Sequence, residues 1–249
     1  MATSFGALCT DFYINQKLTV RMDLPNQRES ILPLFDRVRK SVPSMDRFRR
    51  FEEELALESP RSNLEYRWLA LRQTNVRSGH VNPQSMSETY GFHRLILELV
   101  PYYLTISPID IDYLELMFGF DLECKADHDD VVYEALFRES GIGGVVNVPG
   151  SKVLDVQPTF GVALSDKGDR QAYFEVKTRT RNRRGNANRY QHEPIGIFLT
   201  VRAYGPVSAV EDLITLSEDM SHQAEELASE RLVPNLLTPI AQQITSSSA

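Results

Sequence analysis

The sequence has few cysteines, no long apolar run and no metal-binding motif. Its two cysteines, Cys9 and Cys124, lie far apart and outside any CxxC pair. We therefore expect reduced thiols and a cytoplasmic protein. No run approaches the roughly 18 uninterrupted apolar residues of a membrane-spanning helix. The first residues lack the basic and apolar regions of a signal peptide, so we expect no membrane association.

Catalytic and metal-binding patterns are also scarce. The five histidines form no HxH or HExxH pair, and the sequence contains no GxSxG motif. The acids at Asp127, Asp129 and Asp130 suit the start of a helix better than a metal site. His93, beside Phe92 in an apolar segment predicted to be a strand, is interpreted as a core histidine. We expect no cofactor and no metal.

What is present is typical of a globular protein. The 249 residues are 42% hydrophobic and 24% charged, which is enough apolar material for a sizeable core. The formal net charge of −7 argues against a protein whose whole surface binds nucleic acid, and it leaves room for a local basic patch.

Two segments of the chain resemble each other. FYINQKLTVRMDL (residues 12–24) and DIDYLELMFGFDL (residues 110–122) alternate like strands, and both end in Asp-Leu. A predicted helix follows each, over residues 26–43 and 127–141. Pro33 falls near the start of the first helix, and Gly141 is placed to end the second. We predict that the same unit occurs twice.

Three further strands are predicted in each unit, over residues 47–59, 64–76 and 90–104, and then 152–165, 170–181 and 194–205. The prediction is an α+β protein made of two β-α-β-β-β pseudo-repeats with largely antiparallel sheets and helices on one face. This order resembles the topology of TATA-binding-protein-like and helix-grip folds, without their signature residues. The predicted units are 1–108, 109–206 and a C-terminal 207–249.

The C-terminal unit is predicted to contain a long helix over residues 207–232. Its apolar residues recur three and four apart, and its opposite face is acidic. Pro234 is expected to end this helix. The apolar stripe can pack on the sheet, or it can form a dimer seam.

The string YFEVKTRTR (residues 173–181) follows a strand that contains Asp155. An acid followed by Glu-x-Lys resembles the motif of PD-(D/E)xK nucleases, which implies a divalent cation held near Asp155, Glu175 and Lys177. Strand alternation explains the same residues without a metal, because Phe174 and Val176 would point inward and the charged residues outward. We favour the solvent-exposed strand and keep the nuclease as the alternative.

A basic hairpin is the other candidate site. It comprises Lys177, Arg179, Arg181, Arg183, Arg184 and Arg189, and a matching tip in the first unit carries Arg72 and Arg77. Two such hairpins could bind a phosphate backbone or a protein partner, or could simply keep an edge soluble. The sequence therefore predicts a non-enzymatic binding or scaffold protein that self-associates. A nucleic-acid-associated protein that uses residues 177–189 is the alternative.

Overall fold

The protein is built on one open sheet. A computed structural model describes residues 3–61, 64–146, 148–178 and 193–247. Nine strands pair antiparallel throughout, in the order β2-β3-β4-β5-β1-β6-β9-β8-β7. They are β1 (Asp11–Val20), β2 (Arg47–Arg50), β3 (Leu55–Glu58), β4 (Tyr66–Arg72), β5 (Asn75–Val81), β6 (Ile111–Leu122), β7 (Thr159–Ala163), β8 (Arg170–Lys177) and β9 (Ile195–Tyr204).

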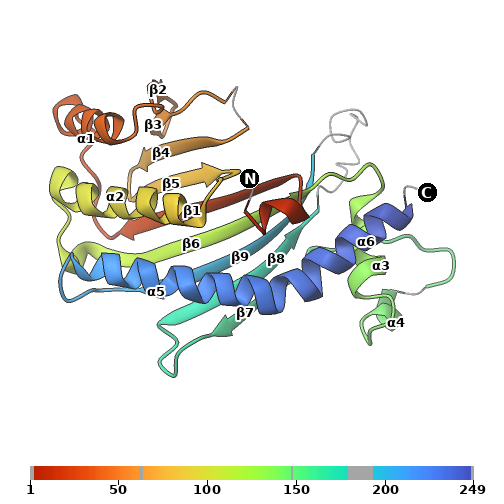
Figure 1. The fold of residues 1–249 in the computed structure, drawn as a ribbon. Coiled ribbons are helices and arrows are strands. Elements are labelled where there is room, and N and C mark those ends of the chain that lie inside the picture. Colours follow the sequence, from red (N-terminus) through yellow and green to blue (C-terminus); the bar gives the residue numbers. More distant parts are fainter. Residues whose placement is uncertain (1–2, 62–63, 147, 179–192, 248–249) are drawn as a thin grey trace.

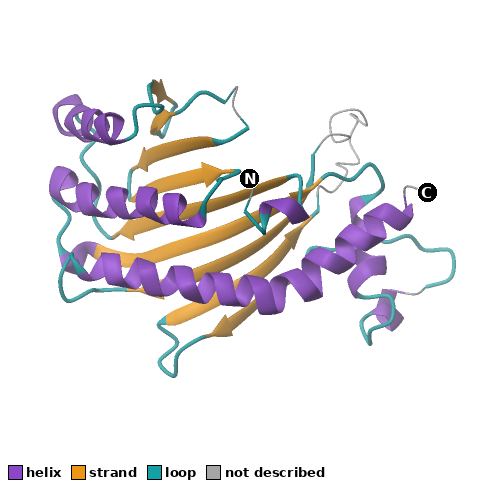
Figure 2. Cartoon of the chain, in the orientation of Figure 1, coloured by secondary structure: helices purple, strands orange, loops and turns teal. Residues whose placement is uncertain are grey.

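Helices form a second layer. They are α1 (Arg28–Ser41), α2 (Met86–Leu104), α3 (His128–Leu136), α4 (Gly143–Val146), α5 (Asp212–Leu227) and α6 (Thr238–Ser247). Figures 1 and 2 show α2 and α5 lying across the same face of the sheet. α5 contacts β6 and β9, whereas α1 packs on α2 and α3 packs on α6. Within the described residues, no helix is both long and apolar enough to cross a membrane.

The core lies between the sheet and this helix layer. In β1, every second residue is buried, because strand side chains alternate between faces. Phe12 and Phe118 come from the two central strands, and Phe5 from the N-terminal segment packs against both, with ring centroids 5.5 and 6.0 Å away. α5 adds Leu213 and Met220 to the same apolar layer. The α+β class is therefore confirmed.

The strand predicted over residues 90–104 is wrong, because this segment is part of helix α2. The Ser85 side chain accepts a hydrogen bond from the Glu88 backbone N–H at 3.4 Å, which is an N-cap contact that the prediction overlooked. Phe92, Ile96 and Val100 are buried at a spacing of four residues, which is the helical period. His93 is indeed buried, but it lies on a helix.

Other boundaries differ from the prediction as well. Residues 47–59 form two short strands, and residues 152–158 precede β7 without strand structure. Pro234 does not end the C-terminal helix. It lies in a π-helical segment, Ala228–Leu237, through which α5 continues into α6. The wider turn of a π-helix accommodates a residue that lacks a backbone N–H.

Candidate functional site

The face of the sheet opposite α2 and α5 carries polar and aromatic side chains. In β1, Tyr13, Asn15, Lys17 and Thr19 are only half-buried, whereas their neighbours along the strand are buried. The pairing registers extend this face across the sheet. We call it the open face and define it by Tyr66, Trp68, Arg72, Asn75, Arg77, Gly79, Tyr13, Asn15, Lys17, Thr19, Tyr113, Glu115, Met117, Gly119, Phe198, Thr200, Arg202, Tyr204, Tyr173, Glu175 and Lys177.

Aromatic rings on the open face lie against glycines of neighbouring strands. Trp68 is paired with Gly79, and Tyr13 with Gly119. A Cβ atom at either glycine would overlap the facing ring. Since glycine presents no side chain, the ring can lie flat on the backbone of the next strand. The glycines therefore leave room on the open face for rings that a side chain at these positions would displace.

Gly119 stands at the centre of this arrangement. It pairs with Tyr13 of β1 on one side and with Phe198 of β9 on the other. The two rings meet across it with centroids 6.4 Å apart. The Lys177 ammonium lies 5.2 Å from the Phe198 centroid, at cation–π distance. The open face is thus continuous from the first half of the chain to the second.

Arg202 gathers a second group of rings. Its guanidinium lies 4.7 Å from the Tyr113 centroid and 5.4 Å from the Tyr173 centroid. Arg202 Nε and Nη2 donate to Glu115 Oε2 at 2.9 and 2.6 Å. Burial alone would lower the pKa of Arg202, but hydrogen bonds with Tyr204 and Glu115 raise it above its ordinary value. The Arg202 guanidinium is therefore a cation held in place between the rings of Tyr113 and Tyr173.

The other cations of the open face also have partners. Lys17 Nζ donates to Tyr113 Oη at 2.9 Å, and Lys177 pairs with Glu175 at 3.1 Å. At the far side, Arg72 and Arg77 both donate to Glu54, a residue in the β2–β3 segment, with Arg72 at 2.8 Å. The carboxylates of the chain itself therefore balance most of the positive charge on this face.

The structure places the predicted basic residues in different surroundings. Arg72 ends β4 beside the turn at residues 73–74, whereas Arg77 lies within β5 and pairs with Glu54. Lys177 ends β8. The remaining hairpin cations, Arg179, Arg181, Arg183, Arg184 and Arg189, lie outside the described residues.

The three residues of the nuclease hypothesis take separate roles. Glu175 and Lys177 share the open face and pair with each other, and Val176 between them is buried. Asp155 is exposed in the segment before β7, where it accepts a hydrogen bond from Gln157 Nε2 at 2.8 Å. Among the described residues, no group of three or more His, Cys, Asp or Glu side chains is arranged to hold a metal ion.

The acids at the start of α3 have structural partners. Asp127 accepts from the Asp129 backbone N–H at 3.2 Å, which is the N-cap contact that its position predicts. The buried Asp129 carboxylate accepts from the Val156 backbone N–H at 2.9 Å and from Thr178 Oγ1 at 2.6 Å. Burial opposes ionisation of Asp127, but Lys152 at 3.1 Å outweighs it and lowers the pKa of that carboxyl. These acids tie α3 to the end of β8.

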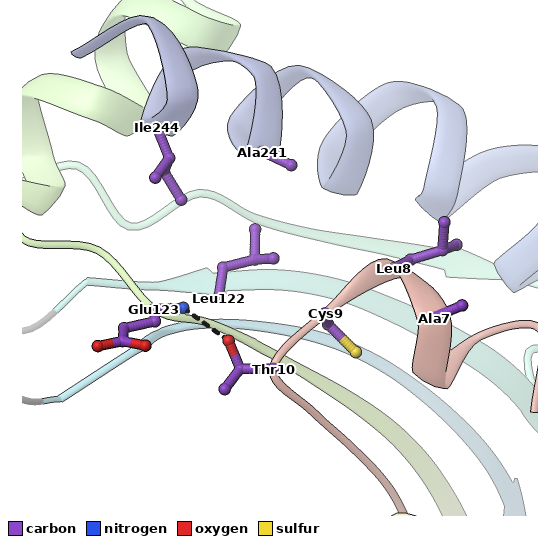
Figure 3. Close-up of a pocket in the computed structure, with 8 residues that line it drawn as sticks. All are labelled: Ala7, Leu8, Cys9, Thr10, Leu122, Glu123, Ala241 and Ile244. Atoms are coloured by element: carbon purple, nitrogen blue, oxygen red, sulfur yellow. Dashed lines mark hydrogen bonds between the residues drawn. The ribbon is translucent and has the colours of Figure 1, made fainter. Parts of the chain in front are cut away.

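A pocket of about 310 Å³ lies between the N-terminal turn, the end of β6 and α6 (Figure 3). Leu8, Leu122 and Ile244 line it, together with Cys9. Burial, with the nearby charges of Asp121 and Asp11, raises the pKa of the Cys9 thiol to about 12. A thiol that stays protonated is a poor nucleophile, and the polar side chains of Thr10 and Glu123 complete the pocket lining.

The sequence interpretation did not include the aromatic rings of the open face. The available signal was glycine inside strand-like segments, at Gly79 and Gly119, which often marks a place where another group approaches the backbone. Comparisons with protein-family models and with curated protein sequences give no match.

Proposed function

We propose that this protein is a non-enzymatic interaction module that binds a protein partner on the open face. The observation that carries this proposal is the set of rings laid over glycines, with Arg202 held between Tyr113 and Tyr173. Rigid Tyr, Trp and Arg side chains are the residues that contribute most to protein–protein binding energy. The partner would present apolar side chains to the rings.

The charges of the open face favour a protein over nucleic acid. A surface that binds phosphates needs cations that are available to replace counterions. Here Arg202 is paired with Glu115, Lys177 with Glu175, and Arg77 with Glu54. Nucleic-acid binding through residues 177–189 stays the alternative, since most of that hairpin lies outside the described residues.

We also propose that the two halves of the chain are copies of one unit, with the topology of TATA-binding-protein-like or helix-grip folds. With the short elements β2, β3, α4 and β7 left aside, the order β1, α1, β4, β5, α2 is followed by β6, α3, β8, β9, α5. In the sheet, β4-β5-β1 lies beside β6-β9-β8, so the strand order of the second half reverses that of the first about the β1–β6 pair.

We propose a cytoplasmic location as well. It is supported by the two cysteines, Cys9 and Cys124, which are both free thiols.

Photo-crosslinking tests the proposed function. A photoreactive phenylalanine analogue at Tyr204, 38% exposed on the open face, is expected to capture one protein partner reproducibly in cells. The matched control is the same substitution at Tyr102, 82% exposed on α2. We expect that nuclease treatment leaves the captured species unchanged. Crosslinks to nucleic acid, or to a second copy of this chain, would contradict the proposal, and so would equal capture from both positions.

The nuclease alternative has its own test. Purified protein is incubated with labelled nucleic acid and Mg²⁺ or Mn²⁺, and the wild type is compared with Glu175→Ala. Metal-dependent cleavage that the substitution abolishes would favour a site at Asp155, Glu175 and Lys177 over the interaction module.

A further inference from the structure

The two edges of the sheet differ in charge. At one edge, β2 presents Arg47, Arg49 and Arg50 in a strand of four residues. Such charges keep an edge strand from pairing with other chains. At the other edge, β7 reads TFGVA, contains no charged residue, and is exposed at every position. Its outer side pairs with no strand in the described part of the chain. An edge of this kind is a template for strand addition.

The outward backbone groups of β7 can be assigned from its pairing with β8. Leu164 N–H donates to Arg170 O at 2.7 Å, and Val176 N–H donates to Pro158 O at 3.0 Å. Hydrogen-bonded positions alternate along an antiparallel ladder, so Phe160 and Val162 also bond toward β8. The N–H and C=O groups of Thr159, Gly161 and Ala163 therefore point away from the sheet.

The side chains of β7 complement a second copy of the same strand. Phe160 is 52% exposed and Val162 is 45% exposed. Both share the face that carries the helix layer, because they pair with Phe174 and Ala172, but α5 makes its main sheet contacts with β6 and β9. If two β7 strands pair antiparallel about Gly161, Phe160 of each copy lies opposite Val162 of the other. Aromatic and β-branched residues are favourable cross-strand pairs.

We infer that two copies of this chain form a dimer through β7, with a twofold axis at Gly161 and a sheet continuous across both copies. Gly161 would pair with its own counterpart, and Thr159 with Ala163 of the other copy. The axis stands perpendicular to the sheet, so both open faces lie on the same side. A partner with two binding segments would then engage both faces at once. Because each copy uses the same strand in this contact, no free β7 edge is left after two copies have joined, and assembly stops at the dimer.

The first test measures association by analytical ultracentrifugation over a range of concentrations. We expect a reversible dimer for the wild type. Val162→Lys should weaken dimerisation by at least about tenfold, since it places a charge opposite Phe160 of the other copy. The control is Val145→Lys, at a valine that is 75% exposed in α4, and it should dimerise like the wild type. A wild-type monomer, an open-ended series of larger species, or an unchanged Val162→Lys dimer would overturn the inference.

The second test fixes the register with disulfides. Residues paired across a hydrogen-bonded position lie about 5.5 Å apart at Cα, which suits a disulfide. The double variant Thr159→Cys with Ala163→Cys should form a covalent dimer on mild oxidation. Either single variant should not, because its new thiol faces the native residue of the other copy. A wild-type dimer whose double variant does not crosslink would place the interface elsewhere and contradict the inference.

Discussion

Phe118→Ala is expected to lower the free energy of unfolding by about 3–5 kcal/mol, the usual range for truncating a fully buried phenylalanine. Phe118 is completely buried between β6 and the helix layer, and its ring lies 5.8 Å from that of Phe12. The substitution leaves a cavity that the surrounding rings cannot fill, because core side chains are closely packed. Urea denaturation followed by circular dichroism measures the loss.

Phe198→Ala is the matched control for this prediction. Phe198 lies on the adjacent strand β9 but on the open face, where Tyr13 and Lys177 are its neighbours. It is only partly buried, so its truncation should cost about 1–2 kcal/mol. Equal losses for the two variants would mean that both faces of the sheet are covered alike, contrary to the fold described above.

Stability is expected to fall steeply as the pH drops below about 6.5. Burial, with the nearby charge of His80, lowers the pKa of His93 to about 3. An unfolded histidine has a pKa near 6.5, so between these values the unfolded state binds a proton that the folded state does not. The contribution of His93 is fully present above pH 6.5 and is lost at about 1.4 kcal/mol per pH unit below it.

His80 acts in the same direction. Burial lowers its pKa, although the hydrogen bond of its Nε2 to Glu65 at 2.9 Å opposes the shift. The prediction is tested by measuring, from pH 7 to pH 4, the urea concentration at which half of the protein is unfolded. His93→Gln removes one titrating group and should flatten the profile, whereas His222→Gln, at an exposed position of α5, should leave it unchanged. A wild-type midpoint that is constant from pH 7 to pH 5 would contradict the account.

Local signals in the sequence predicted the elements that depend on neighbouring residues. α1 and α3 lie within the predicted ranges, because apolar spacing and the Asp127 cap identify them from a few adjacent residues. The helical period of residues 86–104 was also present, but its many apolar residues resemble a buried strand when the Ser85 cap is overlooked. At Pro234 a local signal gave the wrong prediction. Proline usually ends a helix, but here the π-helical turn around Pro234 lets the helix continue.

The open face could not be predicted in the same way. Tyr13 and Gly119 meet only because β1 and β6 pair in one register, and a slip of one residue would turn either to the other face. The salt bridge between Arg202 and Glu115 depends likewise on the β6–β9 pairing. The sequence shows that these residues are present, but only the strand registers show that they meet.

Acrylamide quenching of Trp68, the only tryptophan of the chain, tests most directly whether the open face is uncovered. The indole is half-buried over Gly79 on that face. We expect clear quenching in the folded wild type, and stronger quenching in Gly79→Ala, whose methyl group would displace the ring. Emission that acrylamide leaves unchanged in both proteins would mean that another segment covers the rings, and the open face would not be a binding surface.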